Sequence, residues 1–121
     1  MKKIWKQIPQ FTSYFVSRDG RVLSLQGNEP IILKQQTRLK GYKFLDLREN
    51  GKSIKIDVHR LVLMAFVGMP EKGMECDHIN GIRDDNRLEN LRWVTKIENE
   101  ANKKRLKKIR IKNKFKMKQP L

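Results

Sequence analysis

The sequence predicts an α+β fold: an N-terminal antiparallel β-sheet, a linking helix, a strand–loop–strand–helix unit, and a basic C-terminal helix or tail. Three observations predict it. The first sixty residues alternate apolar and polar side chains between turn signals, which is typical of β-strands. From His59 onward the apolar positions recur at helical spacing. Residues 101–121 carry ten Lys and Arg side chains and no acidic one.

The clearest element of the predicted sheet is a hairpin that joins residues 42–48 to residues 53–58. Its turn is Asn50-Gly51, a pair that readily adopts the two positive φ angles of a type I′ turn. In the second arm Ile54 and Ile56 alternate with polar residues, so one face of the hairpin is apolar. Shorter strands are predicted at 14–17 and 21–25, on either side of a turn at 18–20.

The second half of the chain predicts helix, strand, loop, strand and helix in that order. The first helix begins near His59 and ends before Gly68 and Pro70, because both residues interrupt helical backbone. Thr95 and Glu98 have the spacing of a capping box, so a second helix begins there and continues into the basic tail. Between the helices we expect a strand at 74–78, a polar loop at 80–89 and a strand at 91–94.

The chain is strongly basic, with 28 Lys and Arg against 13 Asp and Glu and a net charge of +15. Such an excess favours a polyanionic partner, nucleic acid first and an anionic membrane surface second. No apolar run could span a membrane, and the N-terminal residues lack the core of a signal peptide. Cys76 is the only cysteine, which excludes an internal disulfide and a thiolate zinc site. We therefore expect a soluble, cytoplasmic protein.

Three side chains of the second half combine into a candidate catalytic site. Asp77 and His78 end one predicted strand, and Asn99 lies in the first turns of the helix that follows. Packing that helix against the strands would bring the three together. Carboxylate and amide oxygens suit Mg²⁺, and an imidazole that titrates near neutral pH can accept a proton from water. These are the groups that phosphodiester hydrolysis needs.

The segments that carry these residues resemble a known family of nucleases. VHRLVLMAF (58–66) and CDHINGIRDDNRLENLRWVTKIENEAN (76–102) are similar to the HNH endonucleases of phages and mobile introns, which have the ββα-metal fold. The resemblance implies catalytic roles for Asp77, His78, Asn90 and Asn99, with Asn90 stabilising the loop. Asn99 stands where many relatives have His. The HNN variants of the family also have Asn at this position. This favours one Mg²⁺ or Mn²⁺ ion, held by Asp77 and Asn99.

The N-terminal stretch resembles the small DNA-binding module that precedes HNH cores in homing endonucleases. The similar segments are IWKQIP (4–9), YFVS (14–17) and GRVLS (20–24). Gln10-Phe11 replaces the usual Gly-Tyr, and Arg18 replaces a common Asn. The two resemblances predict a DNA-binding module at 1–57, a nuclease core at 58–102 and a basic tail at 103–121. We expect the tail to contribute charge rather than packing.

Duplex DNA is the partner that the resemblance and the charge together imply. We expect a monomer, with a dimer as the alternative for double-strand cleavage, encoded by a phage or mobile element and acting in a bacterial host. A guanidinium can clamp two phosphate oxygens, which favours arginines as backbone contacts. The predicted DNA contacts are Arg60, Arg92, Asn102, Lys103, Lys104, Arg105, Lys107 and Lys108.

Other interpretations remain open at the level of sequence. Asp77 and His78 could close a turn through a hydrogen bond, and Asn99 could be a solvated helix residue. His59 could bond backbone at the start of its helix, or contact DNA or the active site. Asn102 could contact either the catalytic centre or a phosphate. At the level of the whole chain, the main alternative is a DNA- or RNA-binding protein without catalysis. A membrane-surface role is disfavoured, because residues 103–118 form no clean amphipathic face.

Overall fold

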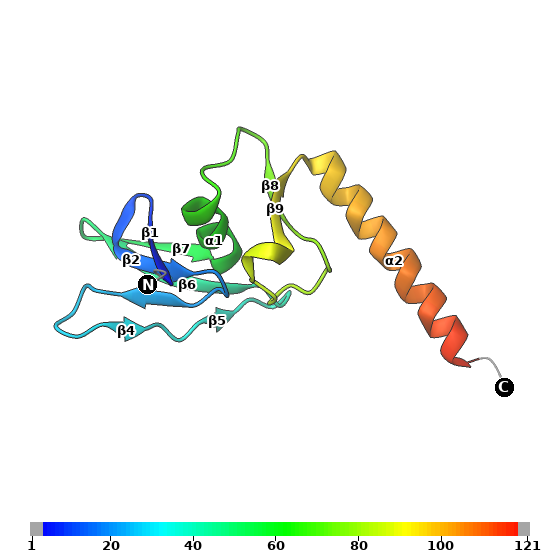
Figure 1. Cartoon of the computed structure of the whole chain (residues 1–121), viewed down its shortest axis with the longest axis horizontal. Helices are drawn as coiled ribbons and strands as arrows, with labels where there is room; N and C mark the ends of the chain where they lie inside the picture. The colour runs from blue at the N-terminus through cyan, green and yellow to red at the C-terminus, as the bar shows by residue number, and fades with distance from the viewer. Residues whose placement is uncertain (1–3, 119–121) are drawn as a thin grey trace.

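Two small antiparallel sheets make up the N-terminal half of the computed structural model, which describes residues 4–118 (Figure 1). The sequence predicted one antiparallel sheet, and the structure divides it into two. The two-residue strands β4 and β5, one at an edge of each sheet, were not predicted, since segments so short carry no alternation. The first sheet has the order β1 (Trp5–Ile8), β2 (Phe11–Ser17), β3 (Val22–Ser24), β4 (Ile31–Ile32), and the second has the order β5 (Gln36–Thr37), β6 (Lys43–Glu49), β7 (Lys52–Asp57).

The β6–β7 hairpin confirms the turn predicted from Asn-Gly. Asn50 and Gly51 have φ angles of 53° and 76°, as a type I′ turn requires. Leu45 and Leu47 of β6 are buried, and Leu47 pairs with Ile54 of β7. The β6 arm therefore turns its apolar side chains toward the interior. The apolar face predicted for the second arm is only partly covered, because Ile56 packs against the core whereas Ile54 is exposed.

Helix α1 (Val58–Phe66) is the centre of the hydrophobic core. Its apolar residues are spaced so closely that nearly every side of the helix is buried, and Leu61, Val62 and Leu63 are fully covered. Both N-terminal sheets and the later strands pack around it (Figure 1). One continuous core therefore crosses position 57, and each fully buried Leu or Val contributes about 1.5–3 kcal/mol relative to an exposed one.

The C-terminal half follows the predicted order of strand, loop, strand and helix. Strands β8 (Glu75–His78) and β9 (Leu91–Val94) pair in antiparallel fashion, with a 3₁₀ turn, η1 (Leu88–Asn90), just before β9. The Trp93 indole donates a hydrogen bond to the Gly68 carbonyl at 2.8 Å. This bond ties β9 to the segment that follows α1, so the hairpin is fixed to the core.

Helix α2 (Lys96–Lys118) begins at the predicted capping box. The Thr95 hydroxyl accepts from the Glu98 amide at 3.2 Å, and the Glu98 carboxylate accepts from the Thr95 amide at 3.1 Å. The helix is continuous through position 103 and extends away from the N-terminal sheets (Figure 1). The first three residues of the predicted N-terminal module and the last three of the predicted tail lie outside the described residues. Within residues 4–118, no helix is both long and apolar enough to cross a bilayer.

Candidate active site

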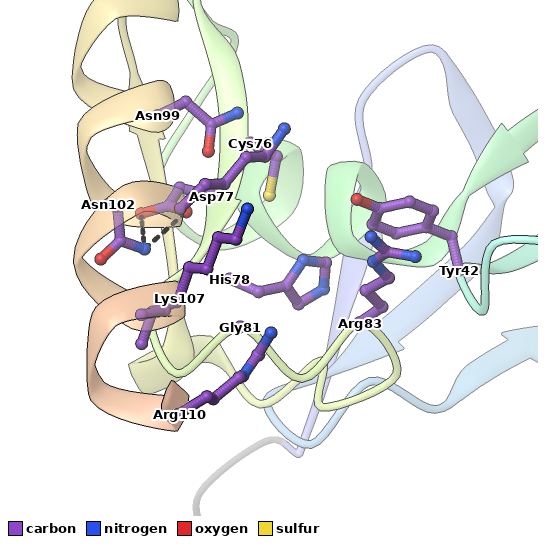
Figure 2. Close-up of a pocket in the computed structure, with 12 residues that line it drawn as sticks. Tyr42, Cys76, Asp77, His78, Gly81, Arg83, Asn99, Asn102, Lys107 and Arg110 are labelled. Carbon is purple, nitrogen blue, oxygen red and sulfur yellow. Dashed lines mark hydrogen bonds between the residues drawn. The ribbon is translucent and has the colours of Figure 1, made fainter. Parts of the chain in front are cut away.

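Strand β8 delivers Asp77 and His78 to the inside of one cavity (Figure 2). The β8–β9 register places Asp77 opposite Arg92 and His78 opposite Leu91. Both side chains are buried, with 3% and 7% of their surface exposed. The pairing of β8 with β9 therefore holds two polar side chains in the interior. An Asp-His pair that only closed a turn would not need to be buried.

Asn90 holds the loop between the two strands in shape. Its Oδ1 accepts from the Asn80 amide at 3.0 Å, and its Nδ2 donates to Asn80 Oδ1 and to the Asp85 carbonyl, both at 2.9 Å. Hydrogen bonds from the Arg87 guanidinium hold the pKa of the Asp85 carboxyl well below its usual range. Asn90 does not line the cavity, which agrees with the loop-stabilising role that the resemblance implies.

The Asp77 carboxylate receives donors from both neighbouring elements. Arg92 of β9 donates to Oδ2 at 2.9 Å, and Asn102 of α2 donates its Nδ2 to both oxygens at 3.0 and 3.1 Å (Figure 2). The Oδ1 of Asn102 accepts in turn from Arg105 at 2.7 Å. Asn102 is buried, so the structure places it in the interior beside Asp77; from the sequence, contacts with the catalytic centre and with a phosphate were both open.

Asn99 lies one helical turn before Asn102 and faces the same strand. Its Nδ2 donates to Glu75 Oε2 at 2.7 Å, and its Oδ1 accepts no hydrogen bond in the described part of the chain. Glu75 and Asp77 are two positions apart on β8, so both side chains lie on the same face of the strand. Glu75 bonds to Asn99 and Asp77 bonds to Asn102. Of the two amides, Asn99 is therefore the one with an oxygen still available to a ligand.

His78 is surrounded by aromatic and amide side chains. Its Nε2 lies 2.8 Å from Asn86 Oδ1. The rings of His59 and Tyr42 lie at centroid distances of 4.8 and 5.8 Å. Burial lowers the pKa of His59 to about 4, and the positive charge of a protonated His78 lowers it as well. His59 is therefore neutral near pH 7. It lies beside the candidate base, so of the alternatives that the sequence left open for His59, the structure places it near the active site.

The cavity has a volume of about 470 Å³ and a basic rim. Arg83 from the loop and Lys103, Lys107 and Arg110 from α2 line it. Figure 2 shows Lys107 and Arg83 on opposite sides of the His78 ring. The rim is thus suited to phosphate oxygens. Burial raises the pKa of the Cys76 thiol to about 12, and the Asp77 charge adds to this effect. The one cysteine in the lining is therefore protonated at neutral pH and is no nucleophile.

Helix α2 packs on the loop at Gly81, which has a positive φ of 76°. A Cβ atom there would lie 2.7 Å from both Leu106 Cδ1 and Arg110 Nη2. The tail was predicted to contribute charge rather than packing, and this expectation is wrong for its first two turns. Leu106 looks like an isolated apolar residue in a charge run, but it closes one side of the cavity.

The residues predicted to contact DNA fall into three groups. Lys103 and Lys107 line the cavity, and Arg92 and Arg105 bond to Asp77 and Asn102. Arg60 lies over the Trp93 ring at 5.3 Å and lines a smaller adjoining hollow with His59 and Glu75. Lys104 and Lys108 are exposed on α2 and line neither hollow.

Sequence reasoning missed five residues of the site. Arg83 and Asn86 belong to a polar loop whose shape has no periodicity to read, and Tyr42 comes from β5–β6, far away along the chain. Glu75 carried a usable signal, because it stands two positions before Asp77 and so shares its face of the strand. Arg110 carried a similar one, since it follows Asn102 and Lys103 by two helical turns.

Comparison with known families identifies the class of protein that this fold and site define. Residues 57–101 match the HNH endonuclease family, and residues 4–48 match the NUMOD4 motif. The chain therefore carries an HNH endonuclease domain, with a NUMOD4 motif ahead of it.

Relatives of the chain occur in phages and in a mimivirus. The chain is 37% identical to the DNA endonuclease I-HmuI of Bacillus phage SP01 over 99 residues, which are 81% of this chain and 56% of that protein. It is 33% identical to the H-N-H endonuclease F-TflII of Escherichia phage T5, over 76% of this chain and 48% of that protein. A solved structure of the HNH homing endonuclease I-HmuI, described as binding and cleaving DNA, superposes with a TM-score of 0.68 and 34% identity over 97% of this chain and 59% of that one. The chain thus spans about half the length of these relatives.

Proposed function

We propose that this chain is a metal-dependent DNA endonuclease, in which His78 is the general base and Asp77 and Asn99 hold one divalent cation. One observation carries the proposal: Asp77, His78 and Asn99 line a single cavity whose rim bears four basic side chains. A DNA- or RNA-binding protein without catalysis needs the basic rim. It does not need a buried carboxylate beside a buried imidazole, because burying both groups costs free energy.

The donor set of the cavity fits a hard cation. Asp77 offers carboxylate lone pairs beyond those that Arg92 and Asn102 occupy, and Asn99 offers a free amide oxygen. No group of three or more His, Cys, Asp or Glu gathers within residues 4–118, so a thiolate or multi-histidine zinc site is not supported. Mg²⁺ and Mn²⁺ are the ions that few protein oxygens bind, with water and substrate phosphate as the remaining ligands. Such an ion would supply Lewis-acid stabilisation of charge on a phosphate oxygen.

The residues of the chain divide the remaining work. His78, neutral, would accept the proton of an attacking water. Arg92 and Asn102 hold the Asp77 carboxylate in one orientation, and the Asn90 bonds keep the loop that follows His78 in place. The basic rim would hold the phosphates on either side of the bond that is cut.

The expected substrate is duplex DNA, which suits both the net charge and the DNA-cleaving relatives. One site per chain implies that a monomer nicks one strand, and a double-strand break would require a dimer or two nicks. We expect the protein to act in the cytoplasm of a bacterial host, where the DNA substrate of a phage-type nuclease is found.

Replacement of His78 by Ala tests the proposal. A general base contributes on the order of 10²–10⁴ to the rate but little to ground-state binding. We therefore expect His78→Ala to lose nicking of a supercoiled plasmid in Mg²⁺ while its DNA affinity stays within a few-fold of wild type. Nicking at the wild-type rate by His78→Ala would exclude this mechanism and favour the binding-protein alternative.

A second experiment separates the metal ligands from their neighbours. Asp77→Ala and Asn99→Ala should weaken Mn²⁺ binding in calorimetry, and raised Mn²⁺ should partly restore nicking. Asn99→His should keep some activity, because His occupies this position in relatives. Asn102→Ala is the matched control: its Oδ1 is already bonded to Arg105, so Mn²⁺ affinity should fall less than in Asn99→Ala. Equal affinity in wild type, Asp77→Ala and Asn99→Ala would remove both residues from the metal site.

A further inference from the structure

Asn86 is a buried polar side chain whose amide faces the proposed base. It comes from the loop between β8 and β9, has 5% of its surface exposed, and places its Oδ1 2.8 Å from His78 Nε2. Neither the metal-binding pair nor the basic rim uses it. Asn is frequent in such loops because it bonds the local backbone, yet here the bond goes to the ring of His78.

We propose that Asn86 is a positioning residue for His78, and that the β2–β3 turn of the N-terminal sheet holds Asn86 in place. The inference rests on the proposed role of His78 as base. An amide oxygen only accepts hydrogen bonds, so the bond to Asn86 Oδ1 requires a proton on His78 Nε2. In the neutral ring the second nitrogen, Nδ1, then carries the free lone pair. Asn86 thus selects both the orientation and the tautomer in which His78 can accept a proton from water.

The β2–β3 turn supports Asn86 from the side opposite His78. A Cβ atom at Gly20 would lie 3.0 Å from Asn86 Cβ and 3.1 Å from Asn86 O, closer than ordinary van der Waals contact, so a side chain at this position would displace Asn86. Gly20 also has a φ of 90°, which side chains disfavour. The Arg18 carbonyl accepts from the Leu88 amide at 2.7 Å, and the Gly20 carbonyl accepts from Gln35 Nε2 at 2.7 Å.

These contacts give the NUMOD4 region a second role. Its β2–β3 turn lies within residues 4–48, and it reaches across the molecule to the loop that carries Asn86. The same segment that resembles a DNA-binding module is therefore also part of the support for the base. The N-terminal sheet is thus connected to the cavity by two successive contacts, one between Gly20 and Asn86 and one between Asn86 and His78.

Two variants of Asn86 with opposite expectations test the inference. Asn86→Leu keeps the branched shape of the side chain but removes the acceptor, and Asn86→Asp keeps an acceptor oxygen at the same reach. Loss of a residue that orients a reacting group typically costs about 10- to 100-fold. We expect Asn86→Leu to lower the single-turnover nicking rate by that factor with DNA affinity nearly unchanged, and Asn86→Asp to retain most of the rate. Ile82→Ala, exposed on the same loop, is the neutral control.

The tautomer of His78 provides a readout independent of cleavage. The chain has only two histidines, so long-range ¹H–¹⁵N spectra of the metal-free protein can be assigned with a His59→Phe variant. We expect the Nε2-protonated form of His78 in wild type and a mixture of tautomers in Asn86→Leu. If Asn86→Leu does not fold, Asn86→Ala gives the same comparison. Gly20→Ala should show both effects in weaker form, because the added methyl displaces Asn86 rather than removing it.

The outcomes distinguish this inference from the proposed function. If His78→Ala is inactive but Asn86→Leu nicks at the wild-type rate, Asn86 does not position the base, and the role of His78 stands. If Asn86→Leu loses nicking with an unchanged His78 tautomer, Asn86 is merely structural and the inference is overturned. If His78→Ala nicks normally, the proposed function fails, and the positioning of a base fails with it.

Discussion

Each histidine of this chain is buried beside the other, and only one of them has a partner suited to catalysis. His78 bonds to Asn86, whereas His59 Nδ1 is buried without a hydrogen-bond partner in the described part of the chain. His59 Nε2 lies 3.8 Å from Asp57, whose charge opposes the effect of burial but does not overcome it. The aromatic contact between the two rings therefore places a neutral, unreactive imidazole against the proposed base.

His59 should make the stability of the protein depend on pH. Its pKa is about 4 in the folded chain, below the usual value of 6.5, so the unfolded chain binds more protons between these values. Stability is therefore full above pH 6.5 and falls as the pH decreases from 6.5 through 4. Each pKa unit corresponds to about 1.4 kcal/mol, so the loss is on the order of 3 kcal/mol.

Urea denaturation of wild type and His59→Phe at pH 7 and pH 4.5 measures this term. Phe keeps a planar ring against Tyr42 but cannot titrate. We expect a smaller loss of stability between the two pH values in His59→Phe than in wild type. The same loss in both proteins would show that carboxylates alone cause the acid sensitivity.

At the scale of the element, the β1–β2 turn departs from the family and carries strain. Gln10 has a φ of 69°, in the left-handed region, where the relatives resembled by this segment usually have Gly. The left-handed conformation raises the free energy of a residue with a side chain by about 1–2 kcal/mol. Gly avoids this penalty, although it loses more backbone entropy on folding.

Gln10→Gly should therefore stabilise the chain by about 0.5–1 kcal/mol. Gln10 is exposed and contributes no side-chain hydrogen bond among the described residues, so nothing offsets the gain. Asn28→Gly, at an exposed bend with an ordinary φ, is the matched control and should be neutral or destabilising. Thermal unfolding of the two variants beside wild type decides the matter. A lower melting temperature for Gln10→Gly would show that the turn is relaxed with Gln.

The elements that sequence predicted best are those fixed by local rules. The Asn50-Gly51 turn and the Thr95–Glu98 capping box depend on neighbouring residues only, and both are confirmed. Helix α1 is confirmed because its apolar residues recur at helical spacing and Gly68 and Pro70 follow its end. Strands β4 and β5 escaped prediction because two residues show no period.

The candidate site was predictable only in part, for a similar reason. Asp77, His78 and Asn99 come together because a strand and the next helix pack locally, and the structure places all three in one cavity. Asn86, Tyr42 and Gly20 depend on contacts between distant segments, and no spacing within one element encodes them. Leu106 was misjudged because its partner, Gly81, is a bare backbone position with no apolar side chain to suggest packing.

At the scale of the whole molecule, α2 serves both the site and the electrostatics. Its first turns supply Asn99 and Asn102, and its middle supplies Leu106 and Arg110. Residues 111–114, which follow, are exposed and include two lysines. Because the helix is continuous, the predicted boundary at 102/103 falls inside a unit that packs on the active-site loop.

Two truncations should therefore behave differently. A chain ending at Arg110 keeps the cavity rim and the Gly81 contact, so it should nick DNA at low salt almost as well as wild type. It loses four lysines, and each phosphate contact contributes about 0.9 to the slope of log affinity against log salt, so the slope should flatten by at most about three to four units.

A chain ending at Asn102 loses all ten basic residues together with Leu106, so both affinity and nicking should fall. Phosphate contacts carry no direct sequence information, so any site preference should survive in the longer truncation. Salt titrations on a preferred and a random duplex, with plasmid nicking at low salt, measure each effect. Equal nicking by the two truncated chains would show that Leu106 and Arg110 do not support the site, and an unchanged salt slope would show that the last four lysines do not contact DNA.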